Sequence, residues 1–265
     1  CDVSESVAVG AVRLLVHLHS RLEILIDADS KVDDGSSKDN GDDEPSLGML
    51  WESCWYPVLS ALSDGIHGSR LTVVIACIDG LSTALTDKHA EYVPVQVMTR
   101  ILVQLILPAA SETARSFARF RNDFVAIDLD NGRETPVERP SDEMAQLEAS
   151  VNRFISSMSE TFIGFMPRLA AHPDILRDLW LNIICALGGY LGGPRVFGKS
   201  KEVENVTRDI GSKTIDAATF ELNGLLVVAK QAKIFESLPS GGELLENTQK
   251  AISGFTLFAK ESTTI

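Results

Sequence analysis

The sequence has few cysteines and no cysteine motif. Its 265 residues include only Cys1, Cys54, Cys77 and Cys185. None of them belongs to a C-x-x-C pair, so their spacing predicts neither a disulfide framework nor a zinc site. Scattered cysteines with apolar neighbours are typical of the reducing cytosol. Because the chain begins with Cys1 rather than Met, we expect it to be part of a longer protein.

Long apolar runs and an excess of basic residues are also missing. The most apolar run, residues 179–191, is too short to span a bilayer and contains Asn182. A net charge of −13, with no basic face visible in the sequence, argues against a nucleic acid partner. Much of the acidity lies in residues 30–46, for which we predict a disordered loop. Residues 128–141 form a second polar segment, which we interpret as a linker between two helical halves.

Apolar residues at helical spacing dominate the rest of the chain. Five strong stripes cover residues 47–62, 71–85, 98–106, 144–169 and 175–187, and weaker ones cover 5–29, 111–126, 214–232 and 242–259. Proline sets several expected limits. Pro57 predicts a kink or early break, Pro108 predicts the end of the third helix, and Pro173 suits the first turn of the fifth.

Convincing strand-and-turn units are absent from this pattern. Amphipathic helices on short connectors cannot each bury an apolar face alone and must therefore stack on one another. We predict an all-α fold, an α-α superhelix of HEAT/armadillo-like repeats, forming a single domain over residues 1–265. Six aromatic residues lie on the stripes and are assigned to the core: Trp51, Trp55, Phe154, Phe162, Phe165 and Trp180.

One motif of catalytic type is complete. Residues 193–200, GPRVFGKS, match the phosphate-loop pattern GxxxxGK[ST], in which backbone amides and the lysine hold phosphates and the hydroxyl holds magnesium. Such a loop follows a buried strand and precedes a packed helix. Here a helical stripe precedes it and the polar residues 201–209 follow it. The segment 71–79 could imitate the apolar strand ending in a metal-holding aspartate, but its spacing favours a helix. We interpret the motif as a chance match.

The other candidate sites are weaker. His17 and His19 are two residues apart and point to different helix faces, so they cannot share a metal ion. The remaining histidines lie near predicted helix ends, where capping or exposure explains them: His67, His89 and His172. Residues 128–132 imitate a calcium loop, but the glycine offset is wrong and the twelfth position is Arg139. We expect no catalytic, cofactor-binding or metal-binding residue.

The order of several segments resembles a known family. The chain carries LLVHLHSR at 14–21, LWESCWYPVL at 50–59, DLWLNII at 178–184 and LNGLLVV at 222–228. This series is similar to the C-terminal "homology downstream" helical repeats of large Arf guanine-nucleotide exchange factors of the Golgi brefeldin-A-resistance type, over residues 11–258. The family's Glu-Ser-Leu-Lys-Asn run is replaced here by AATFELN at 217–223, which is typical of a divergent member.

The resemblance implies a role without catalysis in this chain. The exchange domain and its glutamate finger have no counterpart here, so the parent protein, and not this segment, is expected to promote GDP/GTP exchange on Arf. The implied role is a regulatory and targeting scaffold in Golgi and ER–Golgi vesicular transport, cytoplasmic and peripheral at those membranes. The implied partners are Arf-pathway or Rab-type GTPases and membrane recruitment factors. A generic HEAT/armadillo-like adaptor, direct membrane contact and a homodimer stay open as alternatives.

The interpretation of residues 193–200 as a chance match leads to a direct test. We predict no saturable binding of ATP or GTP at millimolar concentration with magnesium, because no strand precedes the loop to place its amides around phosphates. Isothermal titration calorimetry measures this, with Lys199→Ala as the matched control. Saturable heat in the wild-type chain that is lost in the Lys199→Ala variant would contradict the interpretation.

Overall fold

The computed structural model describes residues 3–32, 53, 55–86, 93–117, 142–191, 212–238 and 241–261. Within these ranges nearly every residue is helical and no strand occurs, which confirms the all-α prediction. The first helix extends to Val32, so its end overlaps the segment expected to be a disordered loop. The rest of that loop and the linker at 128–141 lie outside the described residues.

The helices follow the predicted stripes closely, and most bounds agree within a few residues. A short helix, α11, was not expected. The bounds are α1 Val3–Val32, α3 Tyr56–Ile66, α4 Leu71–Leu85, α5 Val95–Ile101, a π-helix at Leu102–Ile106, a further helix at 107–117, α7 Asp142–Leu169, α8 Pro173–Leu191, α10 Ser212–Gln231, α11 Ile234–Ser237 and α12 Gly241–Glu261.

Two prolines lie where helices begin. Pro57 occupies the first turn of α3, and Pro173 is the first residue of α8. A proline costs nothing at such a position, because the first N–H groups of a helix have no intrahelical acceptor. The expected break at Pro57 is therefore a helix start, and the expected start at Pro173 is confirmed.

The helix expected to end at Pro108 continues instead through residue 117, the last described residue of this segment. Proline in a helix lacks an N–H donor and its ring crowds the carbonyl one turn earlier, which for Pro108 is that of Gln104. The turn that contains Gln104 is the π-helix Leu102–Ile106, whose wider spacing gives that carbonyl more room. The predicted stop was wrong because a local widening of the helix accommodates the ring.

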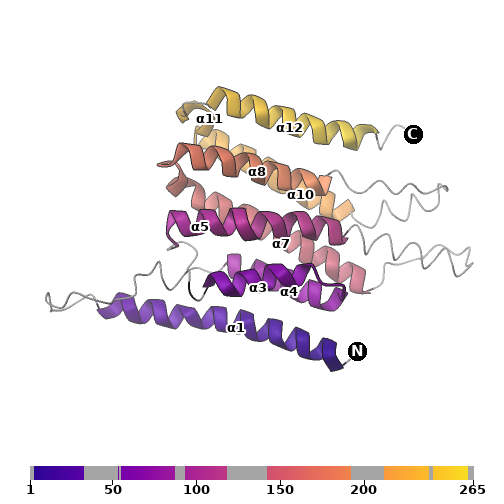
Figure 1. Cartoon of the computed structure of the whole chain (residues 1–265). Helices are drawn as coiled ribbons and strands as arrows, with labels where there is room; N and C mark the ends of the chain where they lie inside the picture. The colour runs from indigo at the N-terminus through magenta and orange to yellow at the C-terminus, as the bar shows by residue number, and fades with distance from the viewer. Residues whose placement is uncertain are drawn as a thin grey trace, which may run out of the picture.

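The helices stack in two rows (Figure 1). One row contains α1, α4, α7 and α10, and each of these packs on the next. The other contains α3, the helix from α5 to residue 117, α8 and α12. Chain order alternates between the rows, so that α3 with α4 and α7 with α8 form pairs joined by short turns.

Side-chain contacts fix the directions of the helices. Ser4 and Glu5 at the start of α1 contact Arg70 and Thr72 at the start of α4, so these two helices run parallel. The helices α4 and α7 are also parallel, because Asp79 contacts Arg153 and the Leu85 carbonyl accepts a hydrogen bond from Thr161 further along both helices. The pair α3 and α4 is antiparallel, as Gly65 lies against Cys77 and Leu62 lies against Gly80.

The core lies between the rows and is mainly apolar. Trp180 of α8 is fully buried, and its ring contacts Phe162 of α7 and Phe235 of α11 at centroid distances of 6.2 and 5.5 Å. Its Nε1–H donates to Thr248 Oγ1 of α12 at 2.9 Å. Trp55, Phe154, Phe162 and Phe165 are buried as predicted, whereas Trp51 lies outside the described residues.

Gly80 sets the distance between α1 and its neighbours. A Cβ atom at Gly80 would lie 2.9 Å from Val16 Cγ2 and 3.1 Å from Leu62 Cδ2, whereas one at Gly164 of α7 would meet no atom within 4 Å. We predict that Gly80→Leu lowers the free energy of unfolding by about 1–3 kcal/mol, because the side chain overpacks this joint. Gly164→Leu keeps or raises stability by up to about 1 kcal/mol through helix propensity.

Urea denaturation followed by circular dichroism measures both changes. Equal effects of the two substitutions would show that the close approach of α1 to α4 is not a constraint on the fold.

Candidate interaction surface

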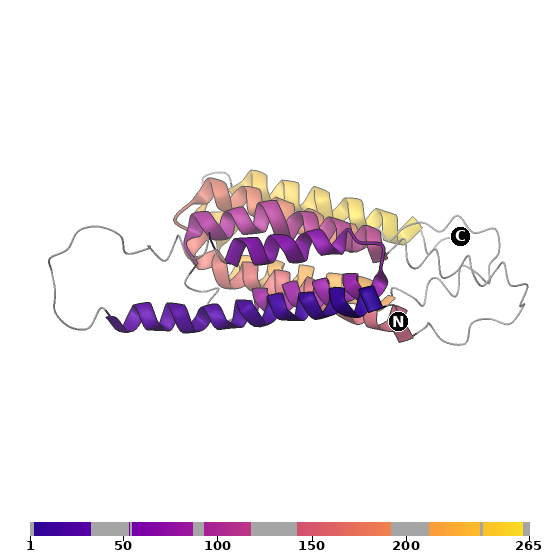
Figure 2. The same cartoon turned by 60° about the horizontal axis from the view of Figure 1, so that its bottom comes forward.

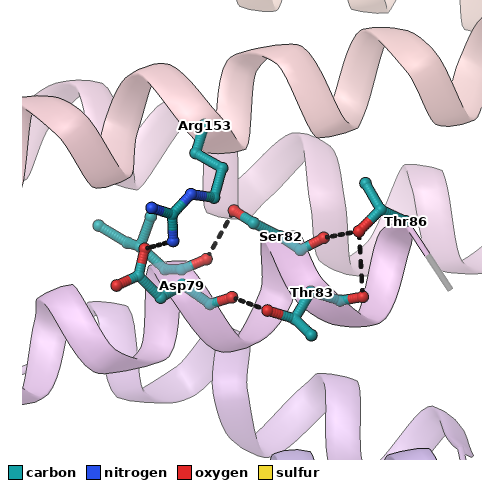
Figure 3. Close-up of polar contacts among 6 residues, drawn as sticks. Asp79, Ser82, Thr83, Thr86 and Arg153 are labelled. Carbon is teal, nitrogen blue, oxygen red and sulfur yellow. Dashed lines mark hydrogen bonds and ion pairs between the residues drawn. The ribbon is translucent and has the colours of Figure 1, made fainter.

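Polar side chains connect α4 to α7 along one side of the stack. Arg153 Nη1 of α7 lies 3.0 Å from Asp79 Oδ1 of α4 (Figure 3). Both side chains are partly exposed, at 60% and 36%, so solvent screens the pair and its contribution to stability is at most about 1 kcal/mol. The pair therefore fixes the alignment of the two helices more than it stabilises them.

The hydroxyl groups beside this pair are already used within α4. Ser82 donates to the Ile78 carbonyl at 2.9 Å and Thr83 to the Asp79 carbonyl at 2.8 Å. Thr86 donates to the Ser82 carbonyl at 3.0 Å. Bonds of this kind to the carbonyl one turn earlier are the usual resting state of serine and threonine in helices. The cluster in Figure 3 is accordingly a structural joint and not a ligand site.

Similar contacts occur at other joints of the stack. Ser156 of α7 donates to Glu221 of α10 at 2.7 Å. In the other row, Tyr190 of α8 donates to the Ala110 carbonyl at 2.9 Å, and burial raises the pKa of this phenol strongly, so it stays protonated. These polar groups face helices of the same chain. They hold its helices together, whereas a few other buried polar atoms of the described residues have no hydrogen-bond partner: Thr99 Oγ1, Ser116 Oγ, Asn152 Oδ1, Ser159 Oγ and Thr214 Oγ1.

Large apolar side chains that remain exposed are concentrated at the ends of the stack. Among the described residues, eight such side chains are exposed, and seven of them belong to α1, α10 and α12, which are three of the four end helices of the two rows. They are Val7, Leu14, Leu18, Ile215, Phe220, Val227 and Leu245. The inner helices α4, α7 and α8 have no exposed large apolar side chain in the described part of the chain, and neither has α3, the remaining end helix.

The face of α1 is the most regular of these surfaces. Val7, Leu14 and Leu18 are 66%, 57% and 50% exposed, and they lie on the side of the helix opposite to the buried Val12. The helix has 30 residues against 15 in α4, and Figure 2 shows it running past the ends of the helices on which it packs. On α10, Phe220 is 74% exposed and Val227 is 53% exposed two turns later.

Two segments, 193–200 and 71–79, imitate parts of a nucleotide site in the sequence. The residues of the phosphate-loop match, 193–200, lie outside the described part of the chain. The segment 71–79 belongs to α4, so the helical interpretation of its spacing is confirmed. Asp79 pairs with Arg153.

The histidines that the structure describes have structural positions. His67 is the C-cap residue of α3, where its backbone N–H donates to Asp64 and Gly65, and it is exposed as expected. His172 lies in the turn before α8, and its N–H donates to the Leu169 carbonyl at 2.8 Å. His17 is exposed on α1. Three other positions lie outside the described residues: His89, the side chain of His19, and the segment from residue 128 to Arg139 that resembles a calcium-binding loop.

Neither a metal-binding cluster nor a membrane-spanning helix occurs in the described part of the chain. It contains no group of three or more His, Cys, Asp or Glu side chains that could hold a metal ion. None of its helices combines the length and the apolar composition needed to cross a bilayer. Comparison with family models, curated proteins and solved structures finds no match for this chain.

The exposed stripes were not foreseen as a surface. Val7 and Leu14 are aliphatic like the buried Val12, and all three fit a helical repeat of apolar residues. The periodicity of α1 therefore identifies a helix, but it does not show which apolar face is covered. A signal did exist in the sequence. Apolar residues at positions 7, 8, 9, 11, 12, 14, 15, 16 and 18 cover more than half of the helix circumference, which is more than one buried face requires.

Two cysteines differ in their surroundings. Cys77 of α4 is 1% exposed and burial raises the pKa of its thiol to about 11, whereas Cys185 of α8 is exposed. At pH 8 about one Cys77 in a thousand is therefore the reactive thiolate. We predict that iodoacetamide alkylates Cys185 rapidly in the folded chain and Cys77 only after unfolding.

Peptide mass spectrometry at successive times, with and without denaturant, measures both rates. Alkylation of Cys77 in the folded chain at the rate of Cys185 would contradict the assignment of Cys77 as an inert core residue.

Proposed function

We propose that this chain is a non-catalytic regulatory and targeting scaffold segment of an Arf guanine-nucleotide exchange factor that acts in Golgi and ER–Golgi vesicular transport. It would lie in the cytoplasm, at the surface of those membranes. Its partners would be Arf-pathway or Rab-type GTPases and membrane recruitment factors. The observation that carries the proposal is the placement of exposed apolar side chains on α1, α10 and α12, at the ends of a stack of helices whose core is mainly apolar.

The finer architecture belongs to this proposal. We assign the chain to the HEAT/armadillo-like α-α superhelices. Two rows of helices, with chain order alternating between them and parallel neighbours within a row, support the assignment. Each pair in such a stack contacts only its neighbours, and the helices at its ends retain uncovered faces. A scaffold of this kind acts through those faces and needs no catalytic group.

The sequence resemblance supplies the Arf part of the proposal. The segment LLVHLHSR begins within α1, and DLWLNII and LNGLLVV lie within α8 and α10. In DLWLNII, Trp180 is the buried residue that joins α8 to α7, α11 and α12. Each of the three segments thus lies on a helix of the stack.

The alternative is a generic HEAT/armadillo-like adaptor unrelated to Arf. The geometry alone, taken without the resemblance, supports this function equally, because uncovered end faces suit any protein partner. The two proposals differ in one measurable respect, which is whether the chain is targeted to Golgi membranes.

We predict that the chain, fused to a fluorescent protein and expressed in cultured cells, concentrates at Golgi and ER–Golgi membranes. The Gly164→Leu variant should behave as the wild type, since its side chain enters open space, whereas Gly80→Leu, which displaces α1, should reduce the concentration there. Confocal microscopy against Golgi and ER–Golgi markers measures the distribution. A diffuse wild-type signal would favour the generic adaptor.

Purified chain added to Arf loaded with a fluorescent GDP analogue tests the non-catalytic part. The rate of nucleotide release should equal that of Arf alone. A clear acceleration would contradict a purely scaffolding role.

A further inference from the structure

The outer face of α10, the last helix of its row, is apolar at its centre (Figure 1). Phe220 and Val227 are 74% and 53% exposed, and only about 20° of the helix circumference separates them. Residues on the opposite side of the helix are buried, among them Leu222 and Ala229. Gly224 lies between the two exposed side chains, and a Cβ atom there would meet no atom within 4 Å. The centre of this face is therefore apolar and open to close approach.

Two opposite charges flank this centre on one side of the helix. Asp216 and Lys230 are exposed, and no ion pair within the described part of the chain involves either of them. They lie about 40° and 80° around the helix from Phe220, in the same direction. Asn223 is also exposed and lies about 60° around in that direction. The acid, the amide and the base thus follow one flank at intervals of seven residues.

We propose that the outer face of α10 binds the same face of a second copy of this chain, with the two helices antiparallel about a two-fold axis at Asn223. The face consists of Asp216, Phe220, Asn223, Val227 and Lys230. Such an axis places each flank beside the same flank of the copy and reverses the direction along the helix. A residue that precedes Asn223 therefore meets the residue that follows Asn223 by the same number of positions in the copy.

This symmetry makes the face complementary to itself. Asp216 and Lys230 are each seven residues from Asn223, so Asp216 meets Lys230 of the second copy, and the contact forms twice. Phe220 and Val227 are three and four residues from Asn223, so each ring packs on the valine of the copy. The remaining charge of the face, Lys213, lies in the first turn of α10, at the rim where solvent screens it.

Other occupants do not account for this arrangement. A helix of a different protein would cover Phe220 and Val227, but it would not require Asp216 and Lys230 at equal distances from the centre. A lipid surface suits the face poorly, because the exposed Asp216 lies on it and the net charge of −13 adds repulsion from anionic headgroups. The charge complementarity therefore favours a second copy.

This inference goes beyond the proposed function and does not rest on the Arf assignment. A monomeric chain that is concentrated at the Golgi would remove the dimer alone. A dimer that is distributed diffusely in cells would remove the Arf assignment alone.

Sedimentation equilibrium of the intact chain tests the association. A single helix-on-helix interface is small, so we expect a reversible equilibrium between monomer and dimer, with dimer predominant at about 100 µM. A chain that is monomeric at that concentration, or that forms larger assemblies, would overturn the proposal.

Charge reversal tests the two-fold arrangement. Asp216→Lys and Lys230→Asp should each weaken the dimer about tenfold or more, because each places like charges opposite one another twice. An equimolar mixture of the two variants should recover the wild-type affinity, since every Lys then meets an Asp. Both side chains are exposed, so circular dichroism should show little change in melting temperature. Unchanged affinity of the single variants, or no recovery in the mixture, would overturn the arrangement.

Substitution of an apolar residue locates the interface. Phe220→Glu should dissociate the dimer, because it places a carboxylate against Val227 of the second copy. Leu14→Glu is the matched control, since Leu14 is an exposed apolar residue of α1, and it should associate as the wild type. Equal weakening by the two substitutions would overturn the location. Flotation with phosphatidylserine-containing vesicles should recover no chain, and flotation that is lost in Phe220→Glu would replace the second copy with a lipid surface.

Discussion

The need to cover apolar helix faces determines the arrangement of this chain. The helices of a row pack on their neighbours in that row, and packing across the rows joins α3 to α4 and α8 to α7 and α10. A helix in the middle of the stack, such as α4, consequently has little surface left, and eight of its fifteen residues are buried. Helices at the ends lack one neighbour, and the exposed Leu14 and Phe220 lie on such helices. The need to cover apolar faces therefore builds the interior of the stack, but it leaves apolar side chains exposed on helices at the ends.

The joints between helices show how the stack combines tight packing with a fixed alignment. Gly80 allows α1 to approach α4 closely, whereas Arg153 and Asp79 fix α7 along α4 through a screened ion pair of low energy. Trp180 does both, because its ring fills space between α7 and α11 while its N–H reaches Thr248 of α12. Apolar burial supplies the stability, and the few directional contacts select one register among those that burial alone would permit.

Much of this fold could be predicted from the spacing of apolar residues, and the exceptions have physical causes. The stripe at 71–85 matches the bounds of α4, because those residues are apolar on a broad face and end in polar turns. The continuation past Pro108 could not be predicted, since proline alone indicates a stop and the relieving π-turn at Leu102–Ile106 has no clear sequence signal. The exposed stripe of α1 could not be assigned either, because exposure depends on which neighbours the other helices provide.

The exposed apolar stripe of α1 bears on function. In a stack of helical repeats the outer face of an end helix is normally polar, which keeps the fold soluble. The stripe on α1 departs from that rule and also lacks the carboxylates that are abundant elsewhere in the chain. Exposing such a stripe risks aggregation, so its presence is best explained by a partner that covers it.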